Sequence, residues 1–300
     1  MMSEHYRSGF VAIVGRPNVG KSTLLNALMG EKISIISPKP QTTRHRILGI
    51  RSEADHQLIF VDTPGMHKGK DLLNITIDKI AVSTLRDVDI VLFVTDRSRG
   101  KAEEHVIEYF KRLDVPVFLV INKIDMLKNR QAIDEIILSY MGLYDFEAIL
   151  PVSAQDQTHL DHLLEAVRPH LPEGPMLYPE TMKSDQSDTR RMAELIREKI
   201  LHHTEQEVPH AVAVVIESLE ENQALKTLDV TALIIVERPT QKQILIGKNG
   251  EKMKRIGTEA RKDINALLDT KIHLSLWVKV KKDWRNRPSD LRSFGYGGDA

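Results

Sequence analysis

The sequence contains no cysteine, which excludes a disulfide framework and thiolate chemistry and suits a reducing compartment. It also has no apolar run close to the roughly 20 residues that a membrane-spanning helix needs. Aromatic residues make up only 5% of the chain, so a sheet face that stacks RNA bases on several aromatic rings is not expected. Together these absences predict a soluble, intracellular protein.

A net charge is absent as well, because 42 basic residues balance 42 acidic ones. Overall charge therefore excludes no class of partner, and local clusters of charge must be read instead. A length of 300 residues suits two domains of ordinary size. The first nine residues are polar and carry no secretory pattern, so we expect a cytoplasmic location.

What the sequence does contain, close to its start, is a phosphate-binding pattern, G-x-x-x-x-G-K-S at residues 15–22. An apolar run at residues 10–14 precedes it, and a helical pattern that ends near Gly30 follows it. In this context, backbone N–H groups and the helix N-terminus attract phosphate oxygens. We expect Lys21 to reach the terminal phosphates and the hydroxyl of Ser22 to bind Mg²⁺. A chance glycine turn before a core helix is the alternative.

A second loop element, Asp62-Thr63-Pro64-Gly65, follows the apolar run at residues 58–61. Open α/β sheets place their ligands at this end of a strand. There Asp62 can orient the hydration shell of Mg²⁺, and the N–H of Gly65 can meet a γ-phosphate. The same residues also suit an ordinary β-turn.

Two stretches upstream of this element complete the region. The runs at residues 47–50 and 58–61, separated by a polar turn, predict a hairpin. The polar stretch at residues 41–46 could hold a threonine that binds a metal ion, although a solvated loop is the better reading of that stretch alone.

The choice of nucleotide follows from Asn122-Lys123-Ile124-Asp125, which ends another apolar run. The Asp125 carboxylate can accept hydrogen bonds from N1–H and the 2-amino group of guanine, and adenine lacks both donors. Asn122 can contact N7 or tie loops together, and the stem of Lys123 can cover the ring. A helix N-cap at Asp125 is the alternative. Downstream, the backbone of Ser153-Ala154-Gln155 could contact O6 of guanine.

Apolar runs alternate with helical patterns through the first half of the chain, which predicts a mostly parallel sheet with helices on both faces. Prolines and a glycine then gather between residues 169 and 179, and a polar stretch follows. We therefore place a domain boundary near residue 175, with a nucleotide-binding domain at 1–175 and a second domain at 176–300.

Taken as a set, these motifs resemble those of the translation-factor-related class of small GTPases, with Thr42-Thr43-Arg44 as the switch-loop element. The resemblance implies that Thr43 binds Mg²⁺ directly and that Asp62 binds it through water. It places Met66 where Ras-like enzymes carry a water-orienting glutamine, which implies slow intrinsic hydrolysis. Relatives with an asparagine like Asn18 in the phosphate loop often use K⁺ in place of an arginine finger, so K⁺ is a candidate cofactor.

The candidate residues for this site fall into two groups. The candidates for nucleotide binding are Gly15, Arg16, Pro17, Asn18, Val19, Gly20, Lys21, Ser22, Thr23, Asp62, Thr63, Pro64, Gly65, Met66, Asn122, Lys123, Ile124, Asp125, Ser153 and Ala154. The candidates for metal binding are Ser22, Thr43 and Asp62 for Mg²⁺ and Asn18 for K⁺.

The second half of the chain shows an α-β-β-α-α-β order of patterns around a Gly247-Lys248-Asn249-Gly250 loop. A G-x-x-G loop alone is weak evidence, but this order resembles a KH domain of the bacterial type, type II, in which residues 244–246 are helical. Such a loop clamps the backbone of single-stranded RNA. A solvated charged face is the alternative for the lysines and arginines nearby. The candidate RNA-binding residues are Ile246, Gly247, Lys248, Asn249, Gly250, Lys252, Lys254 and Arg255.

A P-loop GTPase domain with a mostly parallel α/β sheet, followed by an α+β type II KH domain, resembles the Era family of ribosome-associated GTPases. The resemblance covers residues 9–296 and includes Trp277-Val278-Lys279-Val280. It implies a switch that binds GTP and GDP with Mg²⁺, binds 16S rRNA near its 3′ end and assists assembly of the small ribosomal subunit, without binding DNA. It also implies peripheral association with the cytoplasmic face of the membrane.

Three other functions are the alternatives to this prediction. The first is a constitutive RNA-binding scaffold in which the nucleotide domain is structural. A tRNA-modification GTPase would need a further catalytic domain, and a membrane-trafficking GTPase would need a lipid-anchoring tail.

Overall fold

The computed structural model describes residues 5–66, 71–224 and 226–296. The chain forms two compact units: residues 1–34, 43–69 and 77–185 make up the first, and residues 35–42, 70–76 and 186–300 the second. The stretch at 176–185 thus clusters with the first unit. The predicted limits of 1–175 and 176–300 for separately folding domains stay a prediction, which limited proteolysis would test. The N-terminal segment read for a secretory pattern lies partly outside the described residues.

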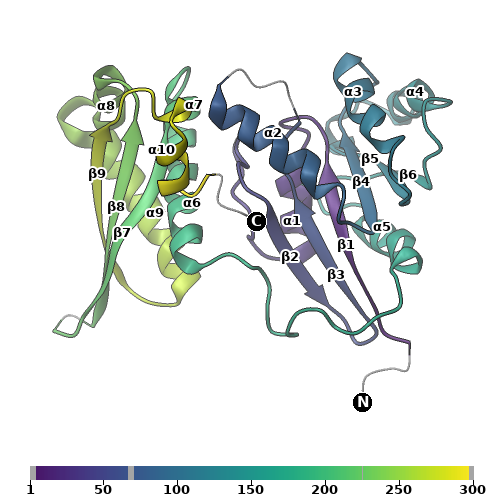
Figure 1. Ribbon diagram of the computed structural model, residues 1–300, viewed down its shortest axis with the longest axis horizontal. Coiled ribbons are helices and arrows are strands. Elements are labelled where there is room, and N and C mark those ends of the chain that lie inside the picture. The colour runs from purple at the N-terminus through teal and green to yellow at the C-terminus, as the bar shows by residue number, and fades with distance from the viewer. Residues whose placement is uncertain (1–4, 67–70, 225, 297–300) are drawn as a thin grey trace. The chain divides into compact units, whose positions relative to one another are not determined.

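The first unit is built on a six-stranded sheet in the order β2-β3-β1-β4-β5-β6 (Figure 1). All neighbouring strands are parallel except β2 and β3, which form the predicted antiparallel hairpin. The strands are β1 (Arg7–Val14), β2 (Ile47–Ser52), β3 (His56–Asp62), β4 (Ile90–Thr95), β5 (Val117–Ile121) and β6 (Ala148–Pro151). Every residue of β4 and β5 is buried, as expected for central strands with both faces covered.

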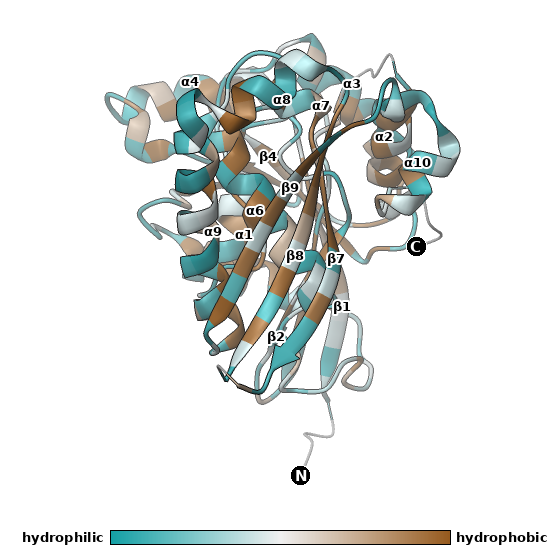
Figure 2. Ribbon diagram, turned by 90° about the vertical axis from the view of Figure 1, so that its left-hand side faces the viewer, coloured by the Kyte–Doolittle hydropathy of each residue, from teal (hydrophilic) through white to brown (hydrophobic). Residues whose placement is uncertain are grey.

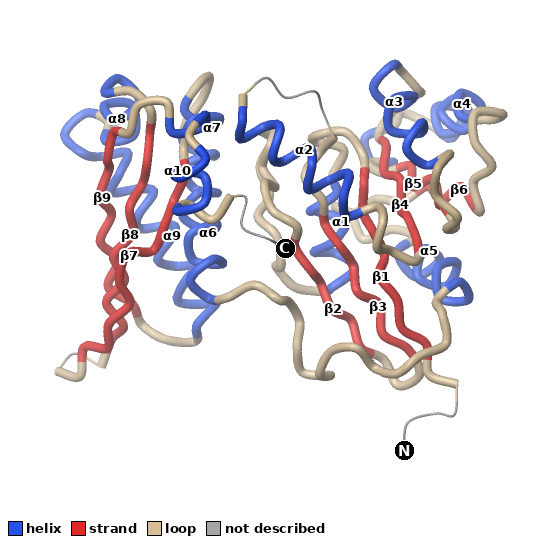
Figure 3. The backbone as a smooth tube through the Cα atoms, viewed as in Figure 1, coloured by secondary structure: helices blue, strands red, loops and turns tan. Residues whose placement is uncertain are grey.

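Helices cover both faces of this sheet (Figure 3). They are α1 (Lys21–Met29), α2 (Leu72–Thr84), α3 (Lys101–Phe110), α4 (Arg130–Tyr140) and α5 (Leu160–Val167). Two separate hydrophobic clusters result, one with apolar residues of α1 and α5 and the other with those of α2, α3 and α4. The predicted mostly parallel α/β architecture is confirmed, and it brings the carboxyl ends of β1, β3, β4 and β5 to one edge.

The second unit packs helices on one face of a three-stranded sheet in the order β7-β8-β9. Strands β7 and β8 are antiparallel, and β8 and β9 are parallel. The elements are α6 (Asp188–His203), α7 (Val208–Ala211), β7 (Ala213–Asn222), β8 (Thr227–Val236), α8 (Pro239–Ile246), α9 (Glu251–Leu268), β9 (Ile272–Val280) and α10 (Pro288–Ser293). Polar and apolar residues alternate along β9 (Figure 2). The predicted α-β-β-α-α-β order is present, with α7 and α10 as short additions.

The segment 35–42 belongs to the second unit through its contacts with α6. Ile35 is part of the hydrophobic cluster of this unit. The backbone N–H of Ile36 donates to the Glu198 carboxylate at 2.9 Å, and Arg197 donates to the carbonyl of Thr42. Residues 35–42, which lead to the candidate metal ligand Thr43, are therefore held by α6 within the second unit.

In the part of the chain that the structure describes, no helix combines the length and the apolar character needed to span a bilayer.

Candidate guanine-nucleotide and RNA-binding sites

The phosphate loop has the backbone that its glycines permit. Gly15 has a φ of 151°, and a Cβ atom there would lie 2.3 Å from the carbonyl oxygen of Val94. Gly20, with a φ of 94°, begins helix α1, and a Cβ atom there would lie 2.3 Å from the side-chain nitrogen of Asn122. A side chain at either position would displace a neighbouring loop. Only glycine therefore lets the loop close at the N-terminus of α1, where backbone N–H groups face an anion.

Lys21 lies folded against this loop. Its Nζ donates to the carbonyl oxygens of Gly15 and Arg16, at 3.1 and 3.0 Å, and the residue is 7% exposed. Burial lowers the pKa of Lys21 to about 8, the nearby Asp62 opposes this, and the charge of Arg16 adds to it. A phosphate group placed at the loop supplies the missing negative charge and favours the protonated lysine.

Three hydroxyl groups converge on the carboxylate of Asp62. Oδ2 accepts from Ser22 at 2.7 Å, from Ser34 at 3.1 Å and from Thr43 at 3.3 Å, and the Ser22 and Thr43 hydroxyls lie 2.8 Å apart. Burial raises the pKa of Asp62, against the charge of Lys21 and the three hydrogen bonds. Among the described residues, Oδ1 of Asp62 is buried with no hydrogen-bond partner.

This oxygen cluster fits a Mg²⁺ ion. Hydroxyl and carboxylate oxygens are ligands that Mg²⁺ prefers, and an unpaired buried carboxylate oxygen is costly without a cation or water beside it. Ser22, Thr43 and Asp62, which the sequence singled out, are brought together here. Ser34 was not predicted, because one serine between two isoleucines carries no pattern that distinguishes it from a loop residue.

The base-recognition loop is tied to its neighbours on three sides. Asn122 donates to the carbonyl of Val19 at 2.9 Å and accepts from the N–H of Ala154 at 3.0 Å, so it ties loops together rather than facing outward. The Ser153 hydroxyl donates to Asp125 at 2.5 Å. Asp125 is an exposed residue, and a carboxylate can accept hydrogen bonds from the amide edge of guanine.

The loop that carries Ser153 contains no glycine between residues 153 and 159. Ser153 and Thr158 exchange backbone hydrogen bonds of 3.1 and 2.9 Å. Gln157 and His159 adopt left-handed φ values of 57° and 60° in place of glycine. Two non-glycine residues in this region store a small strain, which the paired backbone bonds offset.

Most of the remaining predicted residues support the site through the backbone. The Thr63 hydroxyl donates to the carbonyl of Ile13 at 2.9 Å, which fixes the turn after β3. A Cβ atom on Gly65 would lie 2.7 Å from the backbone nitrogen of Pro17, so this turn approaches the phosphate loop closely. Val19 is fully buried. Thr23 lies in the first turn of α1, Pro64 lies in the loop after β3, and Ile124 begins a short 3₁₀ turn.

Met66 and Asn18 are the two residues that the sequence analysis linked to hydrolysis. Met66 is 8% exposed and packs in the cluster under α2, α3 and α4, so its thioether lies against apolar side chains. Asn18 is exposed with a left-handed φ of 65°, at the tip of the phosphate loop. A thioether offers no amide to orient water.

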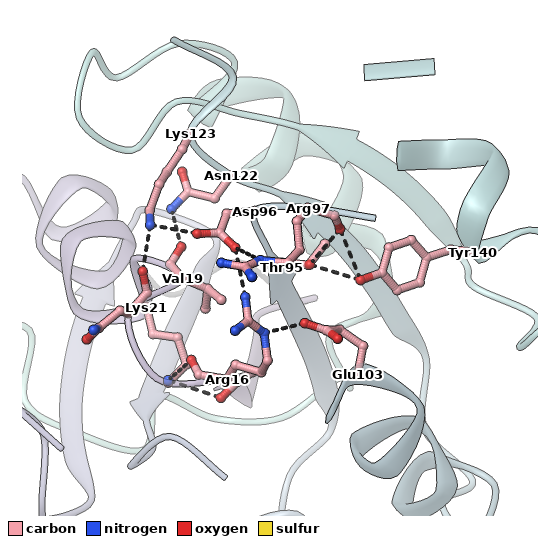
Figure 4. Close-up of polar contacts among 12 residues, drawn as sticks. Arg16, Val19, Lys21, Thr95, Asp96, Arg97, Glu103, Asn122, Lys123 and Tyr140 are labelled. Carbon is pink, nitrogen blue, oxygen red and sulfur yellow. Dashed lines mark hydrogen bonds and ion pairs between the residues drawn. The ribbon is translucent and has the colours of Figure 1, made fainter. Parts of the chain in front are cut away.

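Asp96, at the end of β4, is a site residue that the sequence analysis missed. Its carboxylate accepts from Lys123 at 2.7 Å and from Arg16 at 3.0 Å, which joins the base-recognition loop to the phosphate loop (Figure 4). The signal was available: a carboxylate directly after an apolar parallel strand, as at Asp62, lies at the ligand-binding edge of the sheet.

The glycine loop of the second unit lies between α8 and α9. Gly247 has a φ of 72°, and a Cβ atom there would lie 2.8 Å from that of Lys252. Asn249 and Gly250 also have positive φ, 51° and 77°, and the space around Gly250 is open. The loop thus turns on a left-handed backbone directly before α9, and the predicted helix before it is α8.

A groove of about 570 Å³ begins at this loop. Its floor is apolar, with Met253 and Leu276 among the lining residues, and Lys242, Lys254 and Arg261 also line it. Apolar surface suits base faces and the basic side chains suit phosphates. Trp277, which is 64% exposed, also lines this groove.

Comparisons with known proteins match both halves of the chain. The family model of 50S ribosome-binding GTPases matches residues 10–123, and the KH-domain model matches residues 207–285. The GTPase Era of Heliobacterium modesticaldum is 48% identical over 295 residues, which cover 98% of this chain and 98% of that protein. The GTPase Era of Alkaliphilus oremlandii is 46% identical over 97% of this chain and 99% of that protein.

The chain belongs to the Era family of GTPases.

Solved Era structures agree with this assignment over the full fold. An Aquifex aeolicus Era variant bound to GDP and AlF₄⁻ matches with a TM-score of 0.94 at 41% identity, over 97% of this chain and 100% of that one. Era in complex with MgGDPNP and nucleotides 1506–1542 of 16S rRNA matches with a TM-score of 0.93 at 41% identity, over 98% and 100%. The predicted Era-family architecture, a P-loop GTPase domain followed by a KH domain, is confirmed.

Proposed function

We propose that this Era-family chain binds and hydrolyses GTP as a switch, binds 16S rRNA near its 3′ end and assists assembly of the small ribosomal subunit. One observation carries the nucleotide part: the phosphate loop has a guanine-reading carboxylate, Asp125, on one side and the hydroxyl cluster around Asp62 on the other. The RNA part is supported by the KH groove of this chain and by the relative solved with a 16S rRNA fragment.

In this proposal different residues bind different parts of the nucleotide. Backbone N–H groups of residues 15–23, except Pro17, which has none, cradle the phosphates, and Lys21 neutralises their charge. Ser22, Thr43 and Asp62 hold Mg²⁺, which supplies charge stabilisation and orientation at the phosphates. Asp125 selects guanine, and Ser153 keeps its carboxylate oriented. The Gly65 N–H contacts the γ-phosphate, so that hydrolysis releases the loop that carries it.

Hydrolysis proceeds slowly in this proposal, because Met66 cannot orient the attacking water. Asn18 would help to hold K⁺, which would supply positive charge near the phosphates in place of an arginine finger. Single-turnover hydrolysis should therefore be faster in K⁺ than in Na⁺ at equal ionic strength. Replacing Asn18 with alanine should remove the difference, and equal rates in the two salts with the unchanged protein would refute the role of K⁺.

RNA binding in the KH groove follows from charge and loop geometry together. The double variant Lys248→Ala/Lys254→Ala should weaken binding of an oligonucleotide from the 3′ end of 16S rRNA and reduce its salt slope by roughly 1–2. The matched control is Lys101→Ala/Lys111→Ala on the exposed surface of α3 and the residue after it, which should leave both unchanged. Filter binding with a GTP analogue and with GDP measures the coupling, and equal affinities would favour a constitutive scaffold.

The role in the cell is tested by crosslinking followed by RNA sequencing. Asp125→Asn should shift nucleotide preference from guanine toward xanthine, so that 16S crosslinks near the 3′ end respond to the nucleotide supplied in lysates. From the family resemblance we also propose a cytoplasmic location with peripheral association at the membrane. Cell fractionation tests this, since a peripheral protein leaves the membrane fraction in high salt.

A further inference from the structure

Asp96 lies at a junction that the roles above do not use. Its side chain is 13% exposed. Oδ2 accepts from Nζ of Lys123 at 2.7 Å, and Oδ1 accepts from Nη2 of Arg16 at 3.0 Å. One carboxylate therefore holds a residue of the base-recognition loop and a residue of the phosphate loop at once, as Figure 4 shows.

Each of the two cations that Asp96 binds has one further partner. Lys123 stands on a left-handed backbone with a φ of 63°, and its Nζ also donates to the carbonyl of Asn18 at 2.6 Å. Arg16 forms a second ion pair, with Glu103 of α3, whose side chain is 4% exposed. Arg16 is thus turned toward two acids of the β4–α3 region, so its guanidinium does not extend along the phosphate side of its own loop.

Charge balance shows that Asp96 is ionised in this junction. Burial by itself raises the pKa of Asp96, but the hydrogen bond from Lys123 and the charges of Lys123, Arg97 and Arg16 outweigh it, and the pKa lies below its ordinary value. Arg97 contributes least to the geometry, because its side chain is 62% exposed and its contact is 3.3 Å. The two partly buried cations, Arg16 and Lys123, are the groups that Asp96 fixes.

We propose that Asp96 is a positioning residue for guanine-nucleotide binding, which fixes Lys123 against the phosphate loop so that base recognition and phosphate recognition act as one clamp. This inference rests on the proposed GTP binding. Lys123 can cover the purine ring only while its Nζ stays bound beside the phosphate loop, at Asp96 and the carbonyl of Asn18. Without the carboxylate, Lys123 and Arg16 repel each other and lose a shared acceptor, so bound nucleotide leaves sooner while the groups around the γ-phosphate remain unchanged.

The experiment compares Asp96→Asn with the unchanged protein and with Asp87→Asn, an exposed acid before the other end of β4. Dissociation of a fluorescent GDP analogue should be about 10–100-fold faster for Asp96→Asn, and KM for GTP should rise while kcat stays within about two-fold. Asp87→Asn should match the unchanged protein. In a Lys123→Met background, adding Asp96→Asn should change the dissociation rate little, because the carboxylate acts through that lysine.

Several results would overturn the positioning role of Asp96. Dissociation from Asp96→Asn at the unchanged rate, a fall in kcat with constant KM, or additive effects of the two substitutions would overturn the inference. Asp96→Glu keeps the charge and should give an intermediate rate; if Asp96→Asn fails to fold, an unchanged rate in Asp96→Glu overturns it instead. Failure of the unchanged protein to bind the GDP analogue would instead remove the proposed function, and with it this role.

Discussion

Replacing Arg197 with methionine should destabilise the second unit strongly. Arg197 is 0% exposed and makes two hydrogen bonds to the Glu194 carboxylate, at 2.9 and 2.6 Å, in addition to its bond to the Thr42 carbonyl. Burial lowers the pKa of Arg197, but the charge of Glu194 and its hydrogen bond raise it overall, so the pair is ionised. Removing one partner leaves the other charge buried, which costs about 3–5 kcal/mol.

The assay uses the position of the tryptophans. The chain has two, Trp277 and Trp284, and both lie in the second unit, so tryptophan fluorescence during urea unfolding reports on that unit. With a slope of about 2 kcal/mol per molar urea, the loss of Arg197 should lower the midpoint by roughly 2 M. The transition also tests whether this unit unfolds cooperatively by itself.

Two further variants test whether burial of the ion pair is the reason for the loss of stability in Arg197→Met. Arg238→Met in the same unit breaks an ion pair with Glu207 whose side chains are 69% and 71% exposed, and it should cost at most about 1 kcal/mol. The double variant Glu194→Met/Arg197→Met leaves no unpaired charge, so it should be more stable than Arg197→Met alone. Equal midpoints for Arg197→Met and Arg238→Met would refute the reasoning.

Three other predictions follow from the site. Binding of GDP should take up more protons at pH 9 than at pH 7, because phosphate raises the pKa of Lys21 from about 8; calorimetry in buffers of different ionisation enthalpy measures this, and Lys21→Arg should abolish it. Gly65→Ala should slow hydrolysis and leave GDP affinity nearly unchanged, since the new methyl group would meet Pro17; stopped-flow and filter assays separate the two. Gly250→Ala, at a left-handed φ of 77° in open space, should cost about 1 kcal/mol of stability and weaken RNA binding by distorting the loop, which gel shifts would detect.

Much of the fold could be predicted from the spacing of apolar residues and from the glycines and prolines that mark turns. The alternation of apolar runs with helical patterns predicted the mostly parallel sheet that contains β4 and β5, and the pattern of residues 47–61 predicted the β2–β3 hairpin. The helix before the Gly247 loop was expected only from the resemblance to a type II KH domain, because three apolar residues are too few for their period to distinguish a helix from a strand. Helices α7 and α10 were missed, since α7 is four residues long and α10 is six, too short for a hydrophobic period to emerge.

The site was predictable where its functional residues are neighbours in the sequence, and less so where residues far apart in the sequence meet in the fold. The phosphate loop and the base-recognition loop are local patterns. Ser34 reaches Asp62 across 28 positions, and Arg16 reaches Asp96 across 80, so neither pairing leaves a local trace. The role of Asn122 was left open between base contact and loop contact, and its bonds to Val19 and Ala154 place it between loops.

The anchoring of residues 35–42 on α6 also has an entropic consequence. Ordering eight free residues would cost on the order of 10 kcal/mol of backbone freedom, which metal binding at Thr43 would have to overcome. Here Ile36 and Thr42 are already fixed by Glu198 and Arg197, so most of that freedom has been lost before the metal arrives. The second unit therefore bears the entropic cost of ordering the segment that precedes Thr43.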